Sequence, residues 1–407
     1  MIARNHRRLE PLQPRDTLAR LRPVAHAVAE RPDSIDRPTA LGGAEDGLER
    51  NKVGVDVGDD DSACHGRSIA NARSYNGGVQ ISELGEFGLI DRLARAAGAE
   101  APGDLTVGIG DDAAAWRVGD HVLLATTDTL VEGVHFLPEF APWADVGWKA
   151  LAVNVSDIAA MGGEPLFALA TLALPPETDV AAADDIYAGL VECAAQFGVA
   201  IVGGDIVRAP QVSVNIALIG RAQVQQGMPL LMRRDGAKAG DIIAVSGTLG
   251  DAAAGLWRLR KGAPHDEPLV QAHLRPVPPL ETAQEAARTG IVCAIDVSDS
   301  LIQDLGHICR QSARGAVVAV EKLPLSDDLR SAYPEDALAL ACTGGEDYQL
   351  LMTGDEGAIE QLRENVAVSV TVIGRMVEAE QHLPTLLDAS GIEVALPNAG
   401  WDHLRRA

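Results

Sequence analysis

From about residue 80 onward, apolar residues recur along the chain with two different spacings, which predict helices alternating with strands. Apolar positions three or four residues apart indicate amphipathic helices, and short apolar runs between turn residues indicate strands. A first helix is expected between a Ser82 cap and a stop at Gly98. Further along the first half we expect helices at 145–161 and 181–197, and strands at 105–109, 121–126, 166–174, 199–202 and 212–219.

The pattern begins again after a polar, glycine-containing segment at 232–241. We therefore expect a two-domain α/β (α+β) protein of mixed sheets packed with helices, with an N-terminal domain at 81–232 and a C-terminal domain at 233–407. In the second half, helices are predicted from Gly250 and at 301–314. Strands are predicted at 242–246, 292–297, 316–320, 338–342, 349–353 and 368–373.

Residues 1–80 have a different texture, rich in Arg and Pro and then in Gly and Asp, with little periodicity. No apolar core of a secretory signal follows the basic start, and acidic residues among the arginines argue against a transit peptide. We expect a disordered or dispensable extension, whose deletion over 1–78 leaves activity unchanged.

Composition narrows the class of protein further. The chain has 407 residues, is 47% hydrophobic but only 3% aromatic, and carries a formal net charge of −24. That charge argues against a nucleic-acid partner, and no apolar run approaches the ~18 residues that span a membrane. The charge fits a solvated acidic surface, and it also fits a protein that handles phosphates through divalent cations. Five scattered cysteines without a C-x-x-C pair favour a reducing cytoplasm.

Four segments share one feature, an apolar run that stops at aspartate. They are 107–112, 123–128, 201–205 and 295–299. Taken singly, such an aspartate is more often a turn former or a helix cap than a ligand. If the four meet at strand ends, their charges need bound cations, because two carboxylates ~4 Å apart repel by about 4 kcal/mol at an effective dielectric near 20. Hard oxygen ligands suit magnesium shared with phosphates.

The predicted helix at 145–161 adds Asn154 and Asp157, three residues apart on one face. An exposed polar face is the simpler interpretation, yet the surrounding alanines make a buried groove plausible. The sequence carries neither a P-loop nor the protein-kinase signatures. Any ATP chemistry therefore belongs to another class of phosphotransferase.

Six motifs in this order resemble the thiamine-monophosphate kinase family. They are G-I-G-D-D-A, T-D-T-L-V-E-G-V-H-F, K-A-L-A-V-N-V-S-D-I-A-A-M-G, V-G-G-D, I-D-V-S-D-S and T-G-G-E-D-Y, and the resemblance runs from about Gly85 to His403. The family belongs to the aminoimidazole ribonucleotide synthetase-like superfamily. The resemblance implies transfer of the ATP γ-phosphoryl group to thiamine phosphate. It also implies several magnesium ions, ATP as co-substrate, a potassium ion as a further option, and a homodimer whose sheets pack together, with the N-terminal domain binding ATP and magnesium.

Carried over residue by residue, the resemblance implies three sets of site residues. His135, Glu346 and Trp401 match positions that hold thiamine phosphate, with Trp401 suited to stack on its cationic ring. Transfer is expected to be direct and in line, without an acid–base residue, because a phosphate oxygen is already anionic. The ATP-contacting positions match Gly204, Asp205, Arg234 and Ser298. The magnesium ligands match Asp112, Thr126, Thr127, Asp128, Asp157, Asp205, Asp296 and Asp299.

One position departs from the family pattern, because Ser300 stands where I-D-x-S-D-G has glycine. A serine there strains the turn only if φ is positive, which would put the placement of Asp299 in doubt. Two alternative classes remain, another enzyme of the same superfamily and a non-catalytic relative. A selenophosphate synthetase-like enzyme should carry a reactive cysteine in a glycine-rich N-terminal loop, and a hydrogenase-maturation relative should end in one. A non-catalytic dimeric relative should have lost several of the carboxylates.

Overall fold

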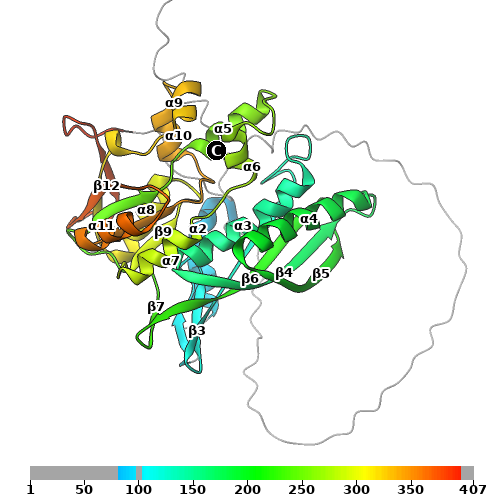
Figure 1. Ribbon diagram of the computed structural model, residues 1–407, viewed down its shortest axis with the longest axis horizontal. Helices are drawn as coiled ribbons and strands as arrows, with labels where there is room; N and C mark the ends of the chain where they lie inside the picture. The colour runs from blue at the N-terminus through cyan, green and yellow to red at the C-terminus, as the bar shows by residue number, and fades with distance from the viewer. Residues whose placement is uncertain (1–80, 98–102, 396–407) are drawn as a thin grey trace, which may run out of the picture.

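The structure, a computed structural model, describes residues 81–97 and 103–395. The expectations for residues 1–80 and for Trp401 lie outside the described residues. The described chain forms two mixed sheets, with helices packed against both (Figure 1). This confirms the predicted α/β architecture. No helix in the described ranges is long and apolar enough to cross a membrane.

The first sheet has the strand order β1-β2-β3-β6-β4-β5, with β7 paired to β6. Its neighbours are antiparallel except for β4 and β5, which run parallel. The strands are β1 (Leu105–Val107), β2 (Ala114–Val118), β3 (His121–Val131), β4 (Gly163–Leu174), β5 (Ala200–Arg208), β6 (Ser213–Gln225) and β7 (Met228–Leu230).

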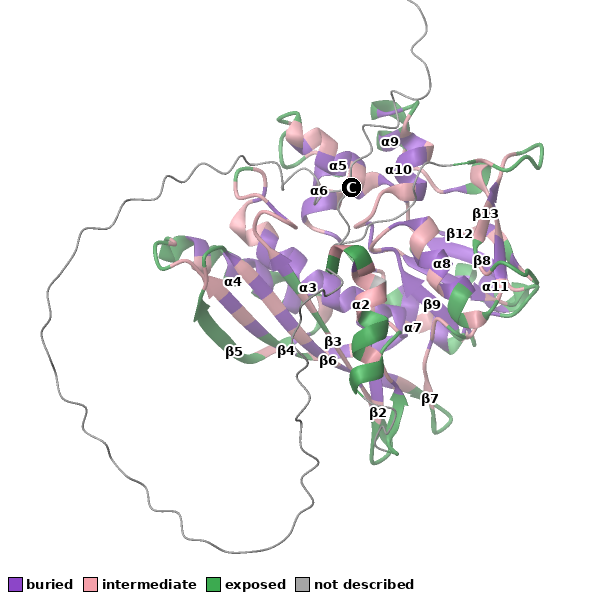
Figure 2. Ribbon diagram, turned by 180° about the vertical axis from the view of Figure 1, so that it is seen from behind, coloured by how far each residue is buried: buried purple, intermediate pink, exposed green. Residues whose placement is uncertain are grey.

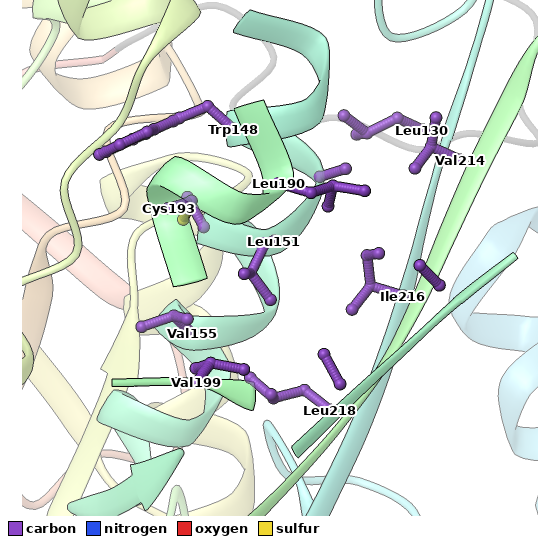
Figure 3. Packing of buried hydrophobic residues seen from close by; sticks show 14 of the residues in the cluster. Leu130, Trp148, Leu151, Val155, Leu190, Cys193, Val199, Val214, Ile216 and Leu218 are labelled. Atoms are coloured by element: carbon purple, nitrogen blue, oxygen red, sulfur yellow. The ribbon is translucent and has the colours of Figure 1, made fainter. Parts of the chain in front are cut away.

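Two helices, α3 (Trp143–Ala160) and α4 (Val180–Phe197), cover one face of this sheet. Strand alternation turns Val214, Ile216 and Leu218 of β6 toward Leu151 of α3 and Leu190 of α4 (Figure 3). Most of α3 is buried, including the polar residues Lys149, Asn154 and Ser156. Its position between the two sheets makes α3 the central support of the site.

The opposite face of the first sheet carries exposed apolar side chains. Phe167 and Leu169 of β4 are 47% and 42% exposed. The edge strand β5 is exposed along most of its length, as its green colour in Figure 2 shows.

The second sheet has the order β13-β10-β12-β8-β11-β9. Apolar side chains of α8 pack on one face, and those of α7 and α11 pack on the other together with Ala159 and Ala160 of α3. The strands are β8 (Ile242–Ser246), β9 (Cys293–Asp296), β10 (Gly315–Ala319), β11 (Leu350–Gly354), β12 (Val370–Val377) and β13 (Pro384–Leu387). The helices are α5 (Asp251–Arg260), α6 (Pro268–Leu274), α7 (Leu280–Arg288), α8 (Leu301–Ser312), α9 (Asp327–Ala332), α10 (Ala337–Thr343) and α11 (Glu356–Asn365).

Three sequence expectations need correction. The predicted strand at 338–342 is wrong, because these residues lie in α10. The run contains only Ala, Leu and Cys, so it lacks the β-branched residues that favour strands and is rich in helix formers. The first helix, α2 (Ile81–Ala97), includes Ser82 instead of starting after it and breaks at Gly85, and its Ile90 and Leu93 are exposed (Figure 2).

The third correction concerns the aspartates expected at strand ends. Asp128 lies within β3 and Asp205 lies within β5. Only Asp296 ends a strand, whereas Asp112 and Asp299 lie in loops. The backbone pairing of β3 and β5 continues past Asp128 and Asp205.

Candidate active site between the two sheets

A cavity of about 420 Å³ lies between the two sheets and receives side chains from both. Its walls come from β3, α3, the end of β9, and the loops that follow β1 and α10. Eleven of the residues expected from the sequence line it: Asp112, Thr126, Thr127, Asp128, His135, Asp157, Arg234, Asp296, Ser298, Asp299 and Glu346.

Three carboxylates meet at the centre of this cavity. Asp112, Asp157 and Asp296 each offer an oxygen within 4.8 Å of the others, although they come from a loop, a helix and a strand end. Burial, followed by the neighbouring charges of Asp128 and Asp296, raises the pKa of Asp157 well above its usual value. Burial and the charge of Asp112 raise the pKa of Asp296 to about 7. The cluster is thus an electrostatically costly arrangement that a cation would relieve.

Helix α3 holds this cluster in place through three polar side chains. The Thr126 hydroxyl of β3 donates a hydrogen bond to Asp157 Oδ2. The Ser156 hydroxyl donates to Asp296 Oδ2 at 2.7 Å and so bridges the two halves of the molecule. Asn154 Oδ1 accepts the backbone N–H of Asp128 at 3.1 Å. The predicted shared face of Asn154 and Asp157 therefore faces the site and not solvent.

The donor set fits magnesium. Its members are carboxylate oxygens, with hydroxyls beside them, and it includes no thiol. Magnesium prefers such hard oxygen ligands, usually few from the protein and the rest from water or substrate phosphates. Asp112, Asp157 and Asp296 are the described residues that would hold such an ion.

Arg234 lies at the edge of the cluster. Its guanidinium donates to Asp112 Oδ1, its Nε lies 3.9 Å from Asp111 Oδ1, and its backbone N–H donates to Asp111 Oδ2. Burial lowers the pKa of Arg234, but the charge of Asp112 outweighs this, and the net pKa is raised. A permanently charged, half-buried guanidinium at this position is suited to contact a phosphate.

The loop 296–300 is organised by Asp304 of α8. One oxygen of Asp304 accepts the backbone N–H groups of Ser298, Asp299 and Ser300 at 3.1, 3.2 and 3.0 Å. Gln303 donates its side-chain amide to Asp299. The loop that carries Ser298 and Asp299 is therefore fixed from beneath.

Ser300 fits its position without strain. Its φ is 175°, an extended conformation open to any residue. Its hydroxyl accepts the Gln303 N–H and caps α8. The doubt about the placement of Asp299 is thus removed, since the serine supplies a cap that glycine lacks.

A second group, formed by Asp299, Asp304 and His307, has ligand atoms within 4.8 Å of one another.

His135 and Glu346 line the same cavity. His135 Nδ1 accepts the Val131 N–H at 3.0 Å, so the neutral ring carries its proton on Nε2 as a donor. Glu346 Oε1 forms an ion pair with Lys149 at 2.8 Å, and Oε2 lies 3.3 Å from Nδ1 of His273, a ring whose pKa is lowered by burial. Burial raises the pKa of Glu346, but Lys149 and His273 outweigh it, so the net pKa lies below the usual range.

Three expected residues differ from the others in their placement. Thr127 lines the cavity, but its hydroxyl accepts a hydrogen bond from Asn215. Asp205 lies on β5, three strand spacings or roughly 14 Å from β3. A Cβ on Gly204 would meet Ala170 O at 1.7 Å, so this glycine is required by the close approach of β4. The structure does not bring Gly204 and Asp205 to the cavity of their own chain.

Sequence reasoning missed Asp111, Asp304 and Glu86, which also line the cavity. Asp111 was within view, next to Asp112 in the same motif. A signal for Asp304 existed in the S-x-x-Q capping spacing of Ser300 and Gln303, which marks the start of α8. Glu86 gave no such signal in the sequence. It lies beside Gly85, where α2 breaks with a φ of 69°, and this break was not predicted.

Comparison with known proteins places this architecture in a class. The chain matches the AIR synthase related protein N-terminal domain over residues 110–222 and the corresponding C-terminal domain over residues 238–385. The chain, with its two sheets and the carboxylate-lined cavity between them, is thus a two-domain AIR synthase related protein.

Individual relatives are more specific. The thiamine-monophosphate kinase of Aquifex aeolicus is 36% identical over 80% of this chain and all of its own length. That of Escherichia coli K12 is 40% identical over 78% of this chain and 98% of its own. A solved structure of AaThiL complexed with AMPPCP and TMP has a TM-score of 0.71, with 34% identity, and covers 81% of this chain and 100% of that one. The chain belongs to the thiamine-monophosphate kinase family.

Proposed function

We propose that this chain transfers the γ-phosphoryl group of ATP to thiamine monophosphate, giving thiamine diphosphate and ADP. The observation that carries the proposal is the buried cluster of Asp112, Asp157 and Asp296, assembled across both halves. The relatives are named for this activity, and the match covers nearly their whole length. A structural relative is complexed with AMPPCP and TMP. The selenophosphate synthetase-like and non-catalytic alternatives have no comparable support.

The metal end of the site is proposed to comprise Asp112, Asp128, Asp157, Asp296 and Asp299, with Thr126 and Thr127 alongside. Bound magnesium would neutralise the phosphate oxygens of ATP and the acceptor. Arg234 contributes a fixed positive charge at the same edge, and Ser298 lies in the loop that Asp304 holds. Potassium dependence stays a prediction.

The acceptor end is proposed to be formed by His135 and Glu346, together with Trp401 beyond the described residues. Glu346, held as a carboxylate, accepts N–H groups, and His135 Nε2–H donates toward an anion. The acceptor phosphate oxygen is anionic at neutral pH. Positioning and charge neutralisation therefore carry the transfer, and no side chain is needed as a general base.

We propose that the protein acts as a homodimer through the open face of the first sheet. Phe167 and Leu169 expose apolar surface there, which a monomer would leave in contact with water. Strand pairing places Asp205 beside Thr171 on this same face. A second copy packed on it accounts for the roles of Gly204 and Asp205, which one chain cannot bring to its own cavity.

We place the reaction in the cytoplasm. The four cysteines within the described residues are buried and unpaired, which suits a reducing compartment.

The proposal is tested with purified protein, ATP, magnesium and thiamine monophosphate. Thiamine diphosphate and ADP are the expected products, and omitting magnesium should remove them. Asp128→Ala should abolish turnover and leave the fold intact. Asp120→Ala, an exposed aspartate in the β2–β3 turn, is the matched control and should keep full activity. ATP turnover with a different acceptor, and none with thiamine monophosphate, would refute the assignment.

A further inference from the structure

Lys149 is an unusual residue for the interior of a helix that faces a core. It lies on α3 and is only 5% exposed. Lysine is rarely buried to this extent unless its charge is paired. The partner is Glu346, whose Oε1 lies 2.8 Å from Lys149 Nζ. This pair crosses from α3, in the first half of the chain, to the loop after α10 in the second.

A third group completes the arrangement. His273 of α6 is also 5% exposed, and its Nδ1 lies 3.3 Å from the second oxygen of Glu346. Lys149 and His273, which come from different elements, thus approach one carboxylate oxygen each. Lys149 and His273 are buried and the Glu346 side chain is 16% exposed, so the charge pair is only partly screened by water.

The backbone of Glu346 is constrained as well. Its φ is 67°, a left-handed conformation that a residue other than glycine adopts only when its surroundings hold it. Its N–H donates to Ser298 O at 2.7 Å, which ties it to the loop beside the metal cluster. Glu346 lines the large cavity, whereas Lys149 and His273 line a smaller neighbouring cavity of about 30 Å³. The carboxylate forms part of the wall, and its two partners stand behind it.

We infer that Lys149 is a positioning residue for the acceptor. With His273, it holds the Glu346 carboxylate ionised and in one place, as an acceptor for the amino group on the ring of the bound acceptor. This inference rests on the proposed contact of Glu346 with thiamine monophosphate. Lys149 precedes Asp157 by eight residues on α3, or about 12 Å along the helix axis. One rigid helix therefore sets the separation between the metal end and the ring end of the site.

The experiment compares Lys149→Met, Glu346→Gln and the double variant with the unchanged full-length chain. KM for thiamine monophosphate, KM for ATP and kcat are measured for each. Lys149→Met should raise KM for thiamine monophosphate about tenfold or more, because the ion pair that holds Glu346 is lost, and leave KM for ATP nearly unchanged. Lys149→Arg should restore most of the loss. Lys322→Met, at an exposed lysine, is the control and should change nothing.

The double variant decides whether Lys149 acts through Glu346. If it does, the double variant has the same KM for thiamine monophosphate as Glu346→Gln alone; independent effects that multiply would overturn the inference. Lys149→Met leaves Glu346 unpaired and Glu346→Gln leaves Lys149 as a lone buried charge, whereas the double variant removes both charges, so its KM can be compared with that of whichever single variant folds. A normal KM in Glu346→Gln would refute the proposed role of Glu346 and the inference with it. A raised KM in Glu346→Gln beside a normal one in Lys149→Met refutes the inference alone.

Discussion

Individual carboxylates in this protein are placed against their own electrostatic preference. Asp157 and Asp296 are buried beside one another and beside Asp112, and the pKa values of Asp157 and Asp296 are raised by burial and by the neighbouring charges. Like charges ~4 Å apart cost about 4 kcal/mol at an effective dielectric near 20. Such a cluster stores unfavourable energy that is useful only when a cation binds.

Asp157→Asn should separate these two effects. The metal-free variant should unfold at a higher temperature than the unchanged protein, because one repelling charge is gone. It should also lose most of the rise in unfolding temperature that magnesium gives the unchanged protein, and its turnover should disappear. Thermal unfolding with EDTA and with magnesium measures both. A variant that magnesium stabilises as much as the unchanged protein would show that Asp157 is not a ligand.

Among the elements, α8 shows how a helix start can carry part of a site. The Ser300 hydroxyl caps the helix, Gln303 contacts Asp299, and Asp304 gathers three backbone N–H groups of the loop. The first turn of α8 therefore fixes Ser298 and Asp299 through bonds that need no bound ligand.

Ser300→Ala should lower the free energy of unfolding by about 1 kcal/mol, because the N-cap hydrogen bond is lost. Ser300→Gly, the residue of the family pattern, should cost only a few tenths of a kcal/mol. Urea denaturation of both variants checks the order. If glycine destabilises more than alanine, the capping role is wrong.

The elements also show what the sequence could and could not predict. Helices with strong periodicity and clear stops, such as α4 with its Asp179 cap and Gly198 end, lie where they were predicted. Periodicity alone could not tell short helices such as α10 from strands, because a short run of buried apolar residues has no visible period; the absence of β-branched residues was the available signal. Six of the cavity carboxylates, Asp112, Asp128, Asp157, Asp296, Asp299 and Glu346, were found from their motifs, whereas Glu86, Asp111 and Asp304 were missed. Lys149 was also missed, because its partner Glu346 lies 197 positions away and only the folded chain brings them together.

At the scale of the whole molecule, one sheet face is the dominant unexplained surface of the described chain. The face bearing Phe167 and Leu169 also carries Asp205, which does not line the cavity between the two sheets. A homodimer formed through this face would cover the apolar surface and would also bring Asp205 against the second copy.

Replacing Phe167 and Leu169 together by aspartate should therefore give monomers, measured by size-exclusion chromatography with light scattering. Two buried charges at a self-complementary interface repel, so dissociation is expected at micromolar concentration. Turnover should fall in parallel because Asp205 no longer meets a second copy. Val180→Asp, at a highly exposed position at the start of α4, is the control. Monomers with full turnover would show that catalysis does not need association of two copies, which would contradict the proposed role of Asp205.

The bridge from Ser156 to Asp296 has a consequence for how the enzyme is made. Synthesis proceeds from the N-terminus, so Asp112, Asp128 and Asp157 emerge from the ribosome before Asp296 and Asp299. A half-finished chain has only part of the carboxylate set and no second sheet against which α3 can pack. Phosphoryl transfer therefore begins only after the later half has emerged and docked.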